Sequence, residues 1–381
     1  MSESARAVPR DHEPPSAIAS MPSMSRNFTT TRSQRSSIHF GISVTGSSLT
    51  CEVKPNLHEA CIADETNAIS LTTMINSLTA VPVAVVSLIA AMSVVPVARG
   101  ATSYAAGPPT QFMKIQGGSI AYDDSGGSGP LVICVPGMGD VRAQYRFLAP
   151  ALARAGFRVV TMDLRGMGES SVEWPDYSAA AVGADMVAMV EHLKASHAFI
   201  IGNSMASAAA VWAAAERPDR IDGIVLIGPF VRDIPTSWAM NALLKVAFVR
   251  PWGVPVWSRY YASLYPTSPP ADFARYQAAL RENLSQRGRF AALQEMLDAS
   301  KAPCEARIPE VRARVLVIMG SKDPDFSDPG AEANLVAKRL HGDLLMVDGA
   351  GHYPHAEMPT KVEPAIVKFL GGASDGVKTG A

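Results

Sequence analysis

The sequence has little charge and almost no imbalance of charge. Only 18% of its 381 residues are Asp, Glu, Lys or Arg, and 34 basic against 35 acidic residues leave a formal net charge of −1. Proteins that bind the phosphate backbone of nucleic acids normally carry a clear positive excess. The charge balance therefore gives no support for a nucleic-acid partner, and we expect none.

Motifs for cofactors and metals are also missing. Two Gly-x-Gly pairs lack the third glycine of a dinucleotide fingerprint, and neither a Gly-Lys-Ser/Thr phosphate loop nor a His-Glu-x-x-His motif occurs. The four cysteines have no metal-like spacing. Cys134 lies in an apolar run and is expected to be a small core residue, whereas a bridge between Cys51 and Cys61 would need an oxidising compartment. We expect no cofactor and no metal.

One long uncharged apolar run is present, from Leu78 to Ala98. Its length is about that needed to cross a bilayer. Residues 1–73 before it are rich in Ser, Thr and Pro and are predicted to be disordered. This extension is untranslated if Met74 is the true start. Residues 74–107 are then a hydrophobic signal or anchor segment with a linker.

Three interpretations of this run remain open. Small residues at Ala98, Gly100 and Ala101 favour cleavage after export, but no Lys or Arg lies between Met74 and the run, which counts against a secretory signal. A retained membrane anchor is the second interpretation, and a buried helix of a cytoplasmic protein is the third. We expect an exported or envelope-associated protein, with membrane association through this run if it is retained.

A strand-turn-helix signal follows at residues 199–206, Phe-Ile-Ile-Gly-Asn-Ser-Met-Ala. An apolar run ends at Gly202 and a small-residue helix starts directly after Ser204, which is the context of a nucleophile elbow. Small residues at Gly202 and Ala206 suit the close main-chain packing of such a turn. Ser204 is the predicted nucleophile, and the alternative is a serine that only caps a helix.

A serine nucleophile needs a base and a carboxylate that orients the base. Asp323 follows a buried apolar run, and His352 lies on a glycine-rich loop after the next one. Asp325 follows the same run as Asp323 and is the alternative acid, although the spacing from Gly320 favours Asp323. The predicted set is therefore Ser204, Asp323 and His352.

Attack on an acyl carbon also places negative charge on the carbonyl oxygen, which requires two N–H donors. The backbone N–H of Met205, directly after the serine, is the first candidate. Met138 is the second, in the loop Pro-Gly-Met-Gly-Asp at residues 136–140 that follows an apolar run. The alternative for this loop is a plain glycine-rich turn.

Together these motifs resemble the α/β-hydrolase superfamily, in its serine-dependent branch with a helical cap. The resemblance covers residues 111–370. Residues 159–170 resemble the family's strand and Asp-x-Arg-Gly-x-Gly-x-Ser motif, and residues 351–359 resemble its histidine loop. The chain departs from the pattern at Pro136, where many relatives carry His, and at Ala206, where glycine is usual. The resemblance implies an α/β-hydrolase fold with a mainly parallel sheet, covering helices and an inserted helical cap.

The order of apolar runs and helical segments predicts a catalytic domain at residues 108–373, followed by a flexible tail at 374–381. One of its helices is expected at residues 145–155. The cap is expected at about residues 230–310, because no strand pattern occurs there. This stretch is rich in aromatic residues, which as a group indicate an apolar substrate although each alone suits the cap's own core: Trp238, Trp252, Trp257, Tyr260, Tyr261, Tyr265 and Phe273.

The expected function is a serine hydrolase that cleaves an ester, thioester, lactone or related acyl bond of a small to medium apolar molecule. A carbon-carbon bond hydrolase of the same fold is one alternative, because Asn203 and Met205 beside Ser204 resemble the elbow of such enzymes. A ligand receptor that keeps the triad with little turnover is the other alternative.

Overall fold

The computed structural model describes residues 43–45, 48–50, 108–235, 247–249 and 251–372. The chain divides into two units, Met1–Pro96 and Val97–Ala381. In the first, strands β1 (Ser43–Thr45) and β2 (Ser48–Thr50) pair antiparallel. The predictions for residues 78–98, for Cys51 and Cys61 and for the tail at 374–381 fall outside the described residues. Among the described residues, no helix combines the length and apolarity that a bilayer crossing requires.

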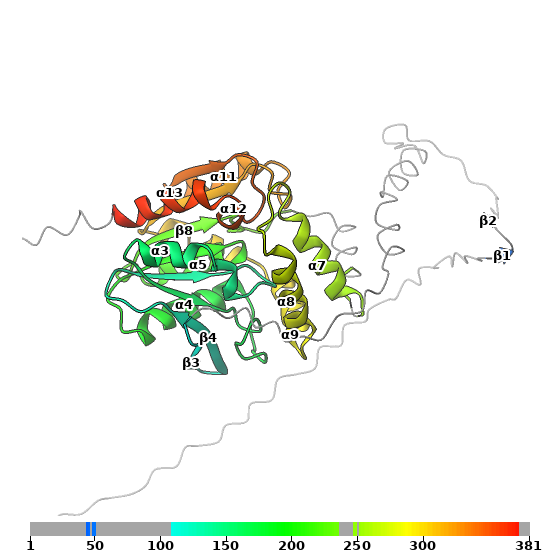
Figure 1. The fold of residues 1–381 in the computed structure, drawn as a ribbon, viewed down its shortest axis with the longest axis horizontal. Coiled ribbons are helices and arrows are strands. Elements are labelled where there is room, and N and C mark those ends of the chain that lie inside the picture. The colour runs from blue at the N-terminus through cyan, green and yellow to red at the C-terminus, as the bar shows by residue number, and fades with distance from the viewer. Residues whose placement is uncertain (1–42, 46–47, 51–107, 236–246, 250, 373–381) are drawn as a thin grey trace, which may run out of the picture. The chain divides into compact units, whose positions relative to one another are not determined.

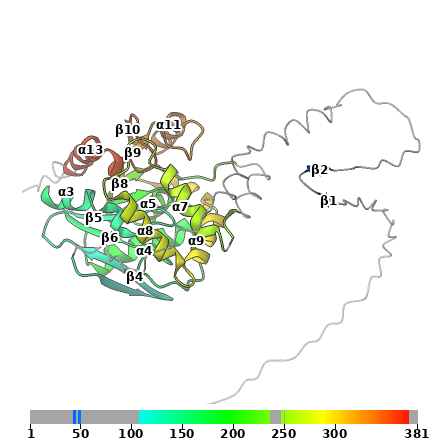
Figure 2. The same ribbon diagram turned by 45° about the vertical axis from the view of Figure 1, so that its right-hand side comes forward.

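The second unit is built on an eight-stranded sheet (Figures 1 and 2). The strand order is β10-β9-β8-β7-β5-β6-β4-β3, and all neighbours are parallel except the pairs β3–β4 and β4–β6. The strands are β3 (Gln111–Ile115), β4 (Gly118–Asp124), β5 (Leu131–Val135), β6 (Arg158–Met162), β7 (Ala198–Asn203), β8 (Ile221–Ile227), β9 (Arg314–Gly320) and β10 (Asp343–Val347). The predicted mainly parallel sheet with covering helices is confirmed.

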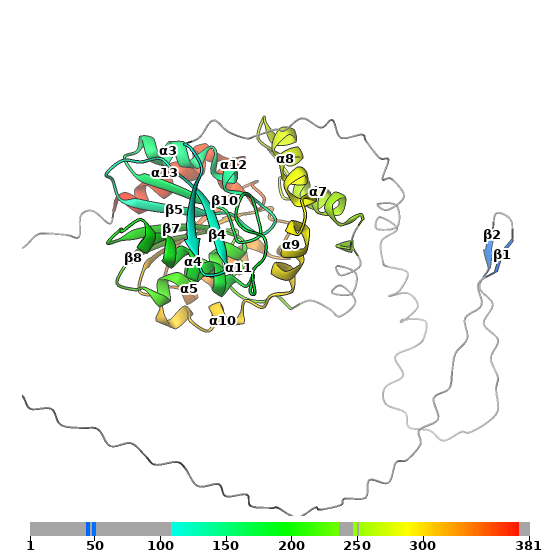
Figure 3. The ribbon, with the colours of Figure 1, turned by 90° about the horizontal axis from the view of Figure 1, so that it is seen from below.

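Helices cover both faces of this sheet (Figure 3). Helices α3 and α13 pack on one face, whereas α4, α5 and α11 pack on the other. Their bounds, with those of two short elements beside them, are η1 (Arg142–Tyr145), α3 (Leu148–Arg154), α4 (Ala179–His192), α5 (Met205–Glu216), α11 (Pro329–Arg339), α12 (Pro354–Glu357) and α13 (Pro359–Gly371).

The central strands are buried on both sides because both faces carry helices. On β5, Ile133 belongs to the apolar cluster of the α4 and α5 face, whereas the neighbouring Val132 and Cys134 belong to the cluster of the opposite face. Cys134 is fully buried, as expected of a small core residue. Such strands appear in the sequence as continuous apolar runs, so their positions can be predicted from the sequence.

The helix expected at residues 145–155 is shorter than predicted. A 3-10 turn ends at Tyr145, and α3 begins only at Leu148. Pro150 explains why the helix begins later than predicted, because proline lacks an N–H and is tolerated in the first turn of a helix but not in its interior. A helix that started at Tyr145 would have placed Pro150 beyond that first turn.

A helical insertion separates β8 from β9. Its described helices are α7 (Gly253–Ser263), α8 (Phe273–Ser285), α9 (Arg289–Asp298) and α10 (Ala302–Glu305), followed by the short turn η2 (Ile308–Glu310). Helices α7, α8 and α9 lie together at one side of the sheet (Figures 1 and 3). Four of the predicted aromatic residues belong to or pack against one small cluster that also includes Tyr353 of the histidine loop: Tyr260, Tyr261, Tyr265 and Phe273. Trp252, by contrast, is 42% exposed.

Candidate active site

Ser204 lies in a strained turn between β7 and α5. Its backbone has φ +55° and ψ −123°, a conformation that residues with a side chain rarely adopt. A Cβ added at Gly202 would lie 2.3 Å from the carbonyl oxygen of Ala206, so only glycine fits two residues before the serine. Strain of this kind concentrates at functional sites. The local geometry is that of the elbow the sequence predicts.

The turn places Ser204 at the ends of the central strands. Its N–H donates to the carbonyl of Ile227 at the end of β8, at 2.8 Å. On the other side, a Cβ at Gly137 would lie 2.9 Å from the Cβ of Ser204. The serine keeps 7% of its surface accessible, and its hydroxyl makes no hydrogen bond to another described residue. The hydroxyl is therefore free to meet a bound molecule.

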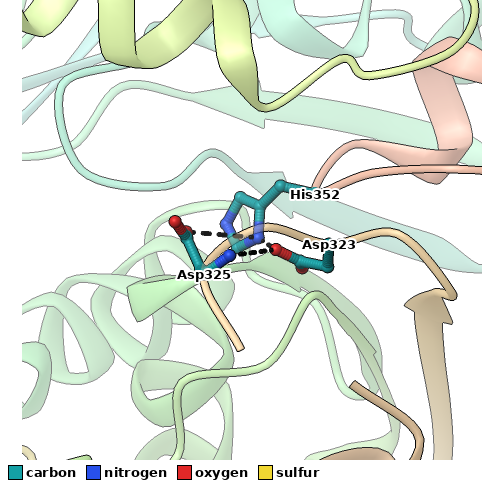
Figure 4. A group of neighbouring side chains, drawn as sticks. All are labelled: Asp323, Asp325 and His352. Carbon is teal, nitrogen blue, oxygen red and sulfur yellow. Dashed lines mark hydrogen bonds and ion pairs between the residues drawn. The ribbon is translucent and has the colours of Figure 1, made fainter. Parts of the chain in front are cut away.

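Asp323 and His352 lie side by side in the interior (Figure 4). Nδ1 of His352 lies 2.7 Å from Oδ2 of Asp323, and both side chains are almost fully buried. Nδ1 also lies 3.6 Å from Oδ2 of Asp325. The backbone N–H of Asp325 donates to Oδ1 of Asp323 at 3.0 Å, which fixes the two carboxylates relative to each other. Of the two candidate acids, Asp323 is the one within hydrogen-bond distance of the imidazole.

The charges around His352 favour its protonated form. Burial alone lowers the pKa of this imidazole, but the carboxylates of Asp323 and Asp325 outweigh burial and raise it to about 9. Burial also raises the pKa of the Asp325 carboxyl above its usual value; His352 opposes that effect and Asp323 adds to it. The imidazole is therefore a stronger base than that of an ordinary histidine, and it can accept a proton from a nucleophile only when it is deprotonated.

The histidine loop is attached to the elbow. Nδ2 of Asn203, the residue before the serine, donates to the carbonyls of Ile227 at 3.1 Å and His352 at 3.3 Å. A Cβ at Gly228, just past β8, would lie 2.9 Å from the imidazole ring. The predicted nucleophile and base thus lie at the same end of the sheet, because Ser204 follows β7, His352 follows β10, and the strands from β7 to β10 are all parallel.

The two predicted oxyanion donors are both unpaired. Within the described part of the chain, neither the N–H of Met138 nor that of Met205 donates a hydrogen bond to a protein acceptor. Met205 is the first residue of α5, where N–H groups are left free by the helix geometry. The loop that contains Met138 is closed by a bond from the N–H of Asp140 to the carbonyl of Gly137, at 3.3 Å. Free donors directly after Ser204 and in the loop that packs against it are what a developing oxyanion requires.

Asp323, Asp325 and His352 also bring three potential metal-ligand atoms within 4.8 Å of one another. These atoms already have protein partners. Nδ1 of the histidine faces Asp323, and Oδ1 of Asp325 accepts a hydrogen bond from Tyr260 at 2.6 Å. Hydrogen bonding within the protein accounts for this group.

Three contacts near the candidate site could not be read from the sequence. Tyr260 donates to Asp325, and Tyr261 and Tyr276 both donate to Asp140 at the end of the oxyanion loop. The sequence located Tyr260 and Tyr261 only as members of an aromatic group. Their spacing along α7 gives no signal for either carboxylate partner.

Comparisons with known proteins identify the family of this chain. Residues 130–359, more than half of the chain, match the family model described as alpha/beta hydrolase fold. The 2-(acetamidomethylene)succinate hydrolase of Mesorhizobium japonicum is 26% identical, over 64% of this chain and 89% of its own. A hydrolase structure from Pseudomonas aeruginosa is 25% identical with a TM-score of 0.57, covering 69% of this chain and 98% of its own.

A third similarity concerns the fold alone. The enol-lactonase structure from Burkholderia xenovorans is 22% identical with a TM-score of 0.58, covering 68% of this chain and all (100%) of its own. At this level of identity the shared architecture is informative, whereas the substrate is not.

Proposed function

This chain belongs to the α/β-hydrolase family, and from that premise we propose that it is a serine hydrolase acting on an ester, thioester, lactone or related acyl bond. The observation that carries the proposal is the strained turn at Ser204. It lies next to the unpaired N–H of Met205 and is linked through Asn203 to the histidine that pairs with Asp323. A helix-capping serine would need none of these neighbours.

The proposed first step is attack of the Ser204 oxygen on the acyl carbon. His352 accepts the hydroxyl proton on Nε2 while Asp323, hydrogen-bonded to Nδ1, stabilises the imidazolium that forms. The carbonyl oxygen becomes an oxyanion and is held by the N–H groups of Met138 and Met205. Collapse of this intermediate breaks the acyl bond, and His352 returns the proton to the leaving group.

The second step removes the acyl group from the enzyme. A water molecule gives its proton to His352 and attacks the acyl carbon, so that the same two N–H donors hold the second oxyanion. Collapse then releases the acid and returns the proton from His352 to Ser204. The elements of water are added across the bond, and the enzyme ends as it began.

Apolar side chains around the histidine support an apolar substrate. The ring of Phe230 lies 6.0 Å from that of His352 and 4.6 Å from that of Phe326. Met138 is partly buried against the main core. We propose that these groups accommodate a small to medium apolar acyl or alcohol part, since polar groups there would be left without partners.

The test combines covalent labelling with turnover. A fluorophosphonate probe should label Ser204, and a panel of p-nitrophenyl esters and lactones should be hydrolysed repeatedly. Ser204→Ala should lose labelling and cost several orders of magnitude in rate, because only binding and oxyanion stabilisation remain.

The matched control is Ser196→Ala, which removes an exposed serine hydroxyl and should act like the parent enzyme. If Ser204→Ala retains more than roughly a tenth of the parent activity, the nucleophile assignment is wrong. Labelling without repeated turnover would instead indicate a ligand receptor on this fold.

A further inference from the structure

Helix α7 contacts both sides of the candidate active site. On one side, Trp257 packs against the oxyanion loop, where a Cβ at Gly139 would lie 2.5 Å from the indole ring. On the other side, Tyr260 donates to Oδ1 of Asp325 at 2.6 Å. Just past the helix, the carbonyl of Leu264 accepts the N–H of His352 at 3.0 Å. One helix of the insertion thus touches the oxyanion loop, the acidic pair and the histidine loop.

Asp325 is the link between this helix and the imidazole. Its two oxygens face different elements, because Oδ2 lies 3.6 Å from Nδ1 of His352 while Oδ1 accepts the Tyr260 hydroxyl. The side chain of Asp325 is only 10% exposed. A second buried carboxylate is costly unless its charge is compensated, and the proposed reaction already has its acid in Asp323.

We propose that Tyr260 and Asp325 form a positioning pair for His352, through which the docking of helix α7 controls the orientation and charge of the imidazole. The inference rests on the proposed serine-hydrolase function. Neither residue touches the reacting atoms, so both act through the histidine.

The pair has two physical effects. The second carboxylate stabilises the imidazolium that forms when His352 accepts a proton, because opposite charges at this separation favour the charged form. The Tyr260 hydroxyl holds Oδ1 away from the ring, so that Asp325 does not compete with Asp323 for the Nδ1 proton. When α7 moves away, Tyr260 is withdrawn and this competition begins. The correctly oriented base therefore exists only with the helix in place.

Other titratable groups also surround the imidazole. Asp323 and Asp325 both follow β9, Asp140 is the last residue of the oxyanion loop, and His355 lies on α12. Burial lowers the pKa of His355 to about 3, so it stays neutral. The negative charge that His352 experiences comes from the three carboxylates, and removing that of Asp325 leaves the other two.

The test is an NMR titration of the His352 imidazole in the full-length chain. The variants are Asp325→Asn, Tyr260→Phe and the double variant, and His352→Gln assigns the resonance. Asp325→Asn should lower the His352 pKa by about 1–3 units, and the pH dependence of kcat/KM should move by the same amount. Tyr260→Phe should shift that pKa in the parent background but not in the Asp325→Asn background, because its effect passes through the carboxylate.

Two controls separate this effect from general changes in charge or packing. Asp298→Asn removes an exposed carboxylate on α9, and Tyr177→Phe removes a tyrosine hydroxyl that donates to the backbone carbonyl of Val172 rather than to a carboxylate. Both should leave the His352 pKa unchanged. Circular dichroism checks that each variant is folded, and Asp325→Ser replaces Asp325→Asn if the latter does not fold.

The outcomes distinguish this inference from the proposed function. An unchanged His352 pKa in Asp325→Asn, or an equal effect of Tyr260→Phe in both backgrounds, overturns the positioning pair even if the enzyme turns over esters. The predicted pKa shifts in a protein that neither reacts with fluorophosphonate nor hydrolyses any ester would support the physical coupling but remove the proposed function, and with it the catalytic meaning of the pair.

Discussion

Ser204 and His352 both depend on a nearby glycine for room. A side chain at Gly202 would overlap the main chain of the elbow, and one at Gly228 would overlap the imidazole. The usual glycine two residues after the nucleophile is Ala206 here, and its methyl group is accommodated in the buried core. The departure at Ala206 thus leaves the strained turn at Ser204 intact.

The pKa of His352 predicts an alkaline activity profile. A general base works only when deprotonated, and the carboxylates raise the pKa of this imidazole to about 9 despite its burial. We expect kcat/KM to rise with pH toward about 9, which stopped-flow or steady-state assays of a p-nitrophenyl ester with correction for spontaneous hydrolysis would measure. A profile that is already flat above about pH 7 would contradict this expectation.

The same pKa has a consequence for stability. Folding raises the pKa of His352 above its value in the unfolded chain, so the protonated form stabilises the fold. This contribution is fully present below the unfolded value of about 6.5 and is lost as the pH rises through about 9. The enzyme therefore gains active base over the pH range in which it loses this stabilisation.

At the scale of elements, the insertion is attached to the oxyanion loop by a buried carboxylate. Asp140 accepts hydrogen bonds from Tyr261 on α7, at 2.9 Å, and from Tyr276 on α8. Burial raises the pKa of Asp140 to about 6, although both tyrosine hydroxyls oppose the rise. Two helices of the insertion are thereby fixed beside the loop that carries Met138.

Removing one of these bonds should loosen the insertion in a pH-dependent way. Tyr276→Phe should lower the free energy of unfolding by about 1.5–3 kcal/mol when Asp140 is charged. The loss should be larger at about pH 8 than at about pH 5, because the hydroxyl favours the ionised carboxyl. Denaturant titrations at both pH values measure it.

Tyr177→Phe is the matched control for this experiment, since its hydroxyl donates to the backbone carbonyl of Val172 rather than to a carboxylate. Its effect on stability should show no change as the pH crosses the pKa of Asp140. Equal losses for Tyr276→Phe at the two pH values would mean that the hydroxyl does not respond to the charge of Asp140.

At the scale of the whole molecule, the catalytic unit is preceded by the uncharged run at residues 78–98. We propose that this run directs the enzyme out of the cytoplasm, because of its length and lack of charge. Expression of the full chain with a C-terminal tag, fractionation and sequencing of the mature N-terminus test the proposal. Export predicts a new N-terminus near Gly100 or Ala101, and anchorage predicts an intact segment in the membrane pellet.

Recovery of unprocessed enzyme in the soluble cytoplasmic fraction would contradict both outcomes for residues 78–98. Deletion of residues 1–107 is the companion experiment, since the described catalytic unit begins after them. The deletion should leave ester hydrolysis unchanged and abolish export.

The sequence by itself determined the features that depend on neighbouring residues. Buried strands appear as apolar runs, and the order of runs and helical segments predicts the parallel sheet. Helix α5 starts at Met205, directly after Ser204 as expected, because small helix formers follow a turn that only small residues permit. The candidate nucleophile, acid and base are also located by local motifs, and their catalytic roles stay predictions.

Tertiary structure alone decided how the distant parts meet. It placed Asp323 rather than Asp325 within hydrogen-bond distance of His352, although both follow the same strand. The bond from Tyr260 to Asp325 joins residues 65 positions apart, and that from Tyr276 to Asp140 joins residues 136 positions apart. No local pattern encodes such pairs, because a side chain's partner depends on how helices of the insertion pack across the ends of the strands. Burial makes these hydrogen bonds important for stability, since a polar group removed from water must find its partner within the fold.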